Sequence, residues 1–248
     1  QDLFQASVAT PRVRTAIAAV QKAGIPLSVA TGRTLDYIRT HSTYLNLTYP
    51  VIAAHGGVIG DPQTGHLYAE VSMPMAIAQE VAAWLDAHDV ITTLYINDDE
   101  GHTHLYQNRL ATDPEQQAFH DYVFGTPRAL SPHFQTLLRS PTARPPLKFL
   151  SDNNPATEED VLPALQARFG EAIYLTRSHP RLVEGMALGV NKGQALRHLC
   201  ALLQIEPQRV LAIGDNDNDI PLLRAAGYGV AMGNATAGLK AIADWIAP

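Results

Sequence analysis

Three short polar segments of the chain carry side chains that could bind a phosphate group and transfer it. Thr31-Gly32-Arg33 offers a hydroxyl donor, Lys192 offers a positive charge, and residues 215–219 include three aspartates. Carboxylate oxygens are the ligands that a hard cation such as Mg²⁺ prefers, and a lysine with hydrogen-bond donors can neutralise phosphate oxygens. Together these residue types predict phosphoryl transfer.

Each segment taken alone also fits an ordinary structural role. Thr31-Gly32-Arg33 could form a strand-to-helix turn, Lys192 could be a solvated lysine, and the acidic run could be a surface turn. A calcium-binding loop is excluded, because that loop needs glycine at its sixth position and glutamate at its twelfth, where this chain has Ile220 and Ala226. The interpretation as one site depends on the three segments occurring together, each at a predicted strand end or helix start.

The predicted elements around these segments should bring them to one place. Ile25–Ala30 and Arg209–Ile213 are apolar runs that predict two buried strands, one ending at Thr31 and the other at Gly214-Asp215. Lys192–Leu203 has the periodicity of a helix. In an open parallel sheet, ligands bind beyond the carboxyl ends of the strands. The polar segments should therefore meet at one edge of the sheet.

Strand-like and helical patterns alternate at both ends of the chain, up to a last predicted helix at Ala237–Trp245. This alternation predicts an α/β fold, a Rossmann-like doubly wound parallel sheet with helices on both faces. The middle of the chain mixes helices with polar strand-like runs, which predicts an inserted α+β domain. We therefore expect a discontinuous core domain of residues 1–71 and 181–248 and a cap, or lid, domain of residues 72–180.

The composition excludes several other classes of protein. The net charge is −6 without a basic run, which argues against a nucleic-acid partner. No apolar stretch approaches the ~20 residues that span a membrane, and no signal peptide is visible. The single cysteine, Cys200, excludes an internal disulfide framework. These features are typical of a cytoplasmic protein.

Three motifs carry a resemblance to a known family. Residues 30–33 (Ala-Thr-Gly-Arg), 189–193 (Gly-Val-Asn-Lys-Gly) and 214–219 (Gly-Asp-Asn-Asp-Asn-Asp) occur in the order of motifs two, three and four of the haloacid dehalogenase superfamily. More narrowly, the chain resembles the Cof-type (subclass IIB) sugar phosphatases. Residues 229–235 (Gly-Val-Ala-Met-Gly-Asn-Ala) fit the same branch, so the resemblance spans almost the whole chain.

The resemblance implies a role for each motif residue. Asp215 would bind Mg²⁺, Asp219 would support the lysine or the metal, and the cap would be a lid that selects a small phosphorylated metabolite. Lys148, His179 and His102–Gln107 are the cap residues that could face this substrate. The remaining motif residues would contact the phosphoryl group or the substrate. Thr31 would offer a hydroxyl donor, Gly32 a backbone N–H and Arg33 its guanidinium. Lys192 would neutralise the phosphate, and Asn218 would offer its amide.

Two positions depart from the family pattern. The Asp-x-Asp-Gly-Thr motif with the nucleophile is absent, so we expect a longer natural polypeptide with ~10–20 more N-terminal residues that contain it. His55 stands where the family usually places asparagine. A phosphatase acting through an aspartyl-phosphate is the leading hypothesis. A phosphomutase or phosphotransferase on the same scaffold, and an inactive phospho-ligand-binding protein, are the alternatives.

Overall fold

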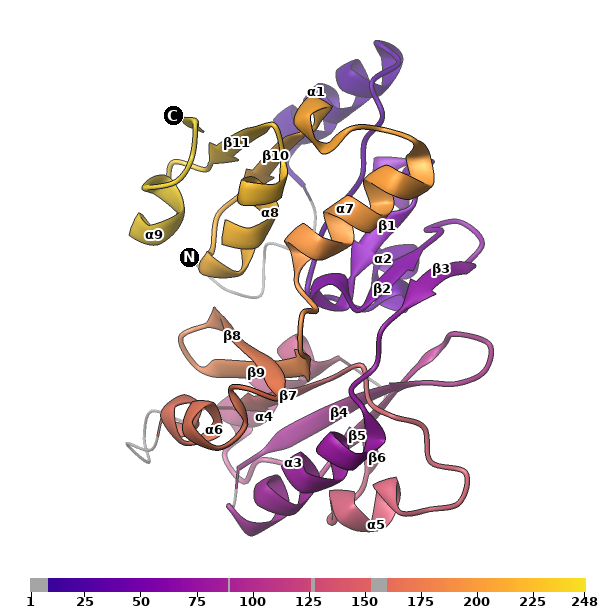
Figure 1. The fold of residues 1–248 in the computed structure, drawn as a ribbon, viewed down its shortest axis with the longest axis vertical. Helices are drawn as coiled ribbons and strands as arrows, with labels where there is room; N and C mark the ends of the chain where they lie inside the picture. The colour runs from indigo at the N-terminus through magenta and orange to yellow at the C-terminus, as the bar shows by residue number, and fades with distance from the viewer. Residues whose placement is uncertain (1–8, 89, 126–127, 153–159) are drawn as a thin grey trace.

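The described chain folds into an upper core with two three-stranded sheets and a lower cap with a third sheet (Figure 1). The computed structural model describes residues 9–88, 90–125, 128–152 and 160–248. The core uses both ends of the described chain. Its elements are α1 (Pro11–Lys22), α2 (Leu35–His41), η1 (Thr43–Leu45), β1 (Val51–Ala53), η2 (Ala54–Gly56), β2 (Val58–Gly60), β3 (Leu67–Glu70), α7 (Lys192–Leu203), η4 (Pro207–Arg209), β10 (Leu211–Gly214), η5 (Asp217–Asp219), α8 (Ile220–Ala225), β11 (Tyr228–Ala231), α9 (Ala237–Lys240) and β12 (Trp245–Ile246).

The cap is a six-stranded sheet in the order β6-β5-β4-β7-β9-β8, with helices on both faces. Side chains alternate between the faces, so Phe149 packs with α3, α5 and α6, whereas its neighbour Leu150 packs with α4. The elements of the cap are α3 (Met75–Ala87), β4 (Thr92–Asn97), β5 (Thr103–Gln107), α4 (Pro114–Phe124), β6 (Ala129–Leu130), α5 (Phe134–Leu138), β7 (Lys148–Asp152), α6 (Val161–Phe169), β8 (Ile173–His179) and β9 (Leu182–Ala187).

The strands of the core form two groups that α7 packs across. β10, β11 and β12 are parallel, while β1, β2 and β3 form an antiparallel meander. Leu196 and Leu199 of α7 belong to one apolar cluster with Ile52 of β1 and Ala231 of β11. The α/β class expected from the sequence is confirmed by this arrangement of parallel strands and covering helices.

Two predicted elements differ in the structure. Ile25–Ala30 is not a regular strand, because it pairs with β1 only through a parallel bridge between Ala30 and Ile52, and Pro26 has no N–H to extend the ladder. The helix predicted over Ala237–Trp245 ends at Lys240. The chain then turns so that Trp245 pairs with Val230 as a third parallel strand.

Part of the core carries apolar surface. Leu211 and Ile213 of β10 are each 57% exposed, and Ile25 is 55% exposed. Among the described residues, β10 pairs with β11 alone, and no residue of α1 is buried. The described part of the core therefore has both an unpaired strand edge and uncovered apolar side chains.

The connections between core and cap lie near residues 71–74 and 188–191. The sequence-based boundary at residue 180 falls inside the β8–β9 hairpin, and β9 also pairs with β7. We therefore propose that the cap extends to about residue 187. Across the described parts of the chain, every helix is too short or too polar to pass through a lipid bilayer.

Candidate active site

A cavity of about 310 Å³ lies between the core and the cap. Residues from four core segments and from the cap contribute to its wall. The sequence-predicted residues that line it are Thr31, Gly32, Arg33, Lys192, Asp215 and Asn218. The seventh predicted residue, Asp219, is buried behind the wall and contacts Lys192. The structure thus brings together all seven positions.

The start of α7 fixes Lys192. Asn191 caps the helix, because its side-chain oxygen accepts hydrogen bonds from the N–H groups of Gly193 and Gln194. Lys192 is the first helical residue, and its Nζ lies 2.5 Å from Asp219 Oδ1. Both side chains are almost fully buried, so the lysine reaches the cavity with its charge already paired.

Asp219 also organises the turn that follows β10. Its second oxygen, Oδ2, accepts hydrogen bonds from the backbone N–H groups of Asp215 at 3.0 Å and Asn216 at 3.2 Å. Gly214 makes this close approach possible, because a Cβ at that position would lie 2.5 Å from Asp219 Cβ. With both oxygens of Asp219 engaged, Asp215 is the carboxylate that is free to face the cavity.

Asp215 has an exposed side chain at the rim of the cavity. Partial loss of hydration raises the pKa of Asp215, and the neighbouring charge of Asp219 raises it further. The charge of Lys192 lowers this pKa, but the net shift is upward. A cation at this position would favour the ionised form. Mg²⁺ is commonly held by one or two carboxylates together with waters and substrate phosphates. Asp215 can supply one such carboxylate. The described residues contain no cluster of three or more His, Cys, Asp or Glu side chains suited to a metal.

The loop after residue 30 presents the Thr31 hydroxyl. The backbone of Thr31 is fixed on both sides, because its N–H donates to Ile52 and its carbonyl accepts from His55. Its Oγ1 accepts a hydrogen bond from the Arg33 N–H at 3.2 Å. A hydroxyl that accepts from the backbone can still donate its own proton, so Thr31 can offer a hydrogen bond to an anion in the cavity.

Arg33 points toward the cap. Its Nη1 donates to the carbonyls of Tyr122 at 3.2 Å and Val123 at 3.1 Å, and its guanidinium lies over the rings of Tyr37 and Tyr122. The arginine thereby links the core to the cap at the wall of the cavity. A direct contact between Arg33 and a phosphate group stays a prediction.

A buried group that joins core and cap completes the wall. Glu184 Oε2 lies 2.5 Å from Lys148 Nζ and 2.9 Å from His55 Nε2. Burial opposes the charge of Glu184, but the two partners outweigh it and hold the pKa of this carboxyl far below its usual range. Lys148 also donates to the Gly32 carbonyl at 2.8 Å. The sequence offered Lys148 as a candidate substrate contact, but not this network.

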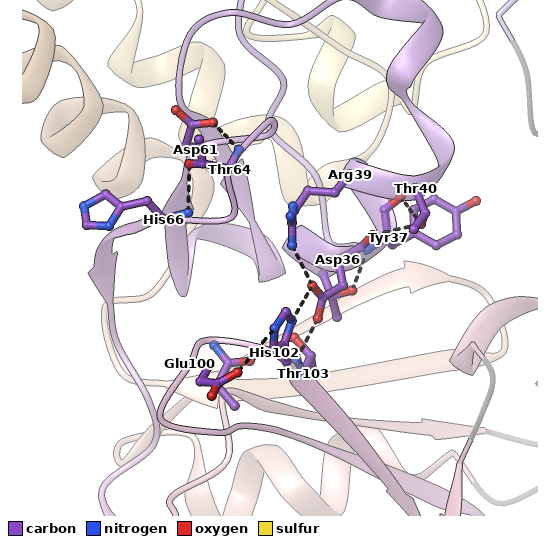
Figure 2. Close-up of polar contacts among 12 residues, drawn as sticks. Asp36, Tyr37, Arg39, Thr40, Asp61, Thr64, His66, Glu100, His102 and Thr103 are labelled. Atoms are coloured by element: carbon purple, nitrogen blue, oxygen red, sulfur yellow. Dashed lines mark hydrogen bonds and ion pairs between the residues drawn. The ribbon is translucent and has the colours of Figure 1, made fainter.

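A larger cavity of about 940 Å³ adjoins the first and shares Gly32, Arg33 and Lys148 with it. Asp36 of α2 lies at its edge and reaches β5 of the cap (Figure 2). Its Oδ2 accepts a hydrogen bond from the Thr103 N–H at 2.7 Å, and its Oδ1 lies 3.4 Å from His102 Nδ1. The second cavity is therefore also bounded by both domains.

Comparison with known proteins identifies the family. A sequence model of the haloacid dehalogenase-like hydrolases matches residues 3–248. The chain belongs to this family. It is 30% identical over 245 residues to Phosphatase YwpJ of Bacillus subtilis strain 168, with 92% of this chain and 85% of that relative covered. It is also 30% identical over 227 residues to the phosphoglycolate phosphatase of Methanopyrus kandleri, with 91% and 77% covered.

The fold of this haloacid dehalogenase-like hydrolase matches solved structures. A haloacid dehalogenase-like hydrolase from B. subtilis superposes with a TM-score of 0.81 at 27% identity, covering 96% of this chain and 87% of the other. The resemblance drawn from the sequence motifs is thus confirmed. Together with the phosphatase relatives, membership of the family makes the chain a phosphoric monoester hydrolase.

Several sequence-predicted contacts in the cap are distributed differently in this haloacid dehalogenase-like hydrolase. Lys148 and His179 line the smaller cavity. His104 lines the larger cavity and not the smaller one. Its ring pairs with Asp98 at 2.8 Å, and His102 pairs with Asp36. The two histidines therefore contact separate carboxylates.

Proposed function

We propose that the protein is a Mg²⁺-dependent phosphatase that hydrolyses small phosphorylated metabolites through an aspartyl-phosphate intermediate. One observation carries the proposal: Thr31, Lys192 and Asp215, from three distant segments, face the same small cavity. A hydroxyl donor, a buried lysine and a free carboxylate suit phosphoryl transfer, which depends mainly on positioning and on stabilising negative charge.

The residues of the chain have separate tasks in this proposal. The Thr31 hydroxyl donates a hydrogen bond to a phosphoryl oxygen and orients it. Lys192, held by Asp219, neutralises negative charge that grows during transfer, and Asn218 orients the bound substrate. Asp215 holds Mg²⁺, which when bound supplies further positive charge to the phosphate oxygens. The closed cap covers the cavity and keeps bulk water from the reacting atoms.

The nucleophile of this proposal requires one more strand. The motif Asp-x-Asp-Gly-Thr does not occur in the sequence. Among the described residues one edge of β10 is unpaired, and this edge and the exposed side chains of Leu211 and Ile213 offer a place for an apolar strand next to Asp215. We propose that such a strand pairs there in the active polypeptide and presents the nucleophilic aspartate next to Thr31 and Asp215.

Phosphate release from a panel of phosphorylated metabolites, measured with and without Mg²⁺ on the complete natural polypeptide, tests the proposal. We expect turnover that depends on Mg²⁺ and is abolished by Asp215→Ala. Asp217→Ala is the matched control, because Asp217 is an exposed aspartate of the same turn that bonds Thr236 and does not line the cavity. Metal-independent turnover, or full activity of Asp215→Ala, would contradict the assignment.

A further inference from the structure

His55 has an unusual backbone conformation at the wall of the cavity. Ala54 and His55 have φ values of 47° and 57°, in the left-handed region that residues other than glycine rarely adopt. Such strain persists only where the surrounding structure holds it, and it concentrates at functional sites. The ring of His55 packs directly on Gly32, because a Cβ built on Gly32 would lie 2.3 Å from His55 Nε2. The two loops therefore fit together only with glycine at residue 32.

The His55 side chain is buried and has few polar neighbours. It is 2% exposed, and its Nε2 approaches Glu184 to 2.9 Å, but neither ring nitrogen has an aligned hydrogen bond. Burial lowers the pKa of His55, Glu184 raises it, and the charges of Lys148 and Lys192 lower it further. The net direction of the His55 pKa is downward, which favours the uncharged form of the ring.

Glu184 connects His55 to Lys148. Its Oε2 is shared between the two, and the ammonium of Lys148 is also held by the Gly32 carbonyl at 2.8 Å and lies 4.7 Å from the centre of the Tyr95 ring. Lys148 lines both cavities between core and cap. A core histidine, a cap carboxylate, a cap lysine and a core carbonyl thus form one continuous chain of contacts across the domain interface.

We propose that His55 is a positioning residue for substrate binding, which seats Glu184 of the cap on the core so that Glu184 holds Lys148 toward the anionic substrate. The inference rests on the proposed phosphatase function and assigns a task within the same site. His55 acts through Glu184 and does not touch the phosphoryl group. If the arrangement that binds the substrate is present in a smaller fraction of the molecules, the apparent affinity for the substrate falls by the same factor. Loss of His55 should therefore weaken binding more than it slows the chemical step, whose residues Thr31 and Lys192 lie on the core.

Two binding readouts test the proposal in the complete polypeptide: KM for the best substrate of the metabolite panel, and the Kd of inorganic phosphate by calorimetry with Mg²⁺. His55→Leu keeps an apolar bulk but removes the polar ring from Glu184. It should raise both constants by about 10-fold, the scale of losing one polar contact to a buried carboxylate. It should leave kcat within about 3-fold, as expected when an interaction contributes equally to the ground and transition states.

Two variants separate positioning from mere stability. His55→Asn should bring KM back to within about 3-fold of the unaltered protein, because asparagine tolerates the left-handed conformation and offers an amide donor to Glu184. His198→Gln, at an exposed histidine of α7, should change neither constant. If His55→Leu does not fold, Lys148→Met tests the same chain of contacts from its other end, with the same expected rise in both constants.

The outcomes distinguish this inference from the proposed function. An unaltered protein that neither releases nor binds phosphate would overturn both. If the unaltered protein is active and His55→Leu, or Lys148→Met in its place, leaves KM and the phosphate Kd unchanged, only the positioning role is refuted. A fall in kcat without a rise in KM would also refute it, because His55 would then act on the transition state alone.

Discussion

The buried pair of Lys192 and Asp219 allows the stability of the site to be separated from its chemistry. Asp219 contacts the lysine ammonium at 2.5 Å with one oxygen and two backbone N–H groups with the other. Asp219→Ala would remove all three contacts. It would also leave Lys192, whose side chain is only 7% exposed, with an uncompensated charge.

The expected loss of stability is large. Removing one partner of a buried ion pair costs about 3–5 kcal/mol, a substantial part of the ~5–15 kcal/mol by which a domain is stable. For a chain of this size each kcal/mol lowers Tm by about 2–4 °C, so the melting temperature of Asp219→Ala should fall by about 10 °C. The double variant Lys192→Met/Asp219→Asn removes both charges and retains a side-chain oxygen for the two N–H groups. It should recover most of the lost stability.

Thermal unfolding followed by circular dichroism, with phosphate release measured on the same samples, provides the assay. Neither variant should turn over substrate, although the double variant melts close to the unaltered protein. Asp217→Ala, at the exposed aspartate of the same turn, should be nearly unchanged in both measurements. If the double variant melts as low as Asp219→Ala, the unpaired lysine is not the cause of the instability and the reasoning fails.

Three further predictions concern other contacts. Gly193→Ala should lower the free energy of unfolding by about 1–3 kcal/mol in urea titrations, because a Cβ there would lie 2.2 Å from the Pro221 carbonyl oxygen. Burial opposes the charge of Asp152, but hydrogen bonds, first that from His120, hold its pKa below the usual value. Its stabilisation is thus complete above pH ~4 and lost as pH falls through the lower folded pKa, so Asp152→Asn should show a smaller decline in Tm between pH ~5 and ~2. Arg33→Lys should raise KM by about 10-fold in the phosphate-release assay, because one ammonium cannot reproduce the two carbonyl contacts and the ring stacking of the guanidinium.

The sequence predicted those parts of the site that depend on local patterns. Residues at strand ends and at the start of a helix were expected to converge, because parallel strands deliver their carboxyl ends to one edge. Thr31, Lys192 and Asp215 accordingly line one cavity. The strand at Ile25–Ala30 was wrong in extent, since a strand needs neighbours with which to pair, and an apolar run does not show whether they are present.

The parts that sequence reasoning missed depend on long-range packing. Nothing in the local pattern around His55 indicates that its ring packs on Gly32 and meets Glu184, because these residues come together only when the cap closes on the core. Likewise, Arg33 adjoins the predicted phosphate-binding threonine, yet its guanidinium finds its partners almost ninety positions away in α4. A signal was present in one case: a glutamate and a lysine within otherwise apolar strand segments, at 184 and 148, predict a buried ion pair.

The short connection between β9 and α7 links movements of the cap to the start of a core helix. Residues 188–191 alone join the strand that carries Glu184 to the helix that starts with Lys192. Within them Gly189 has φ +83°, a conformation that gives the chain a sharp change of direction. A rotation of the cap that lifts Glu184 away from His55 must be absorbed in this short joint or be passed to the first turn of α7. Glu184 and Lys192 lie on opposite sides of Gly189, so a rotation of the cap that Gly189 does not absorb also shifts Lys192, the residue that we propose binds the phosphate.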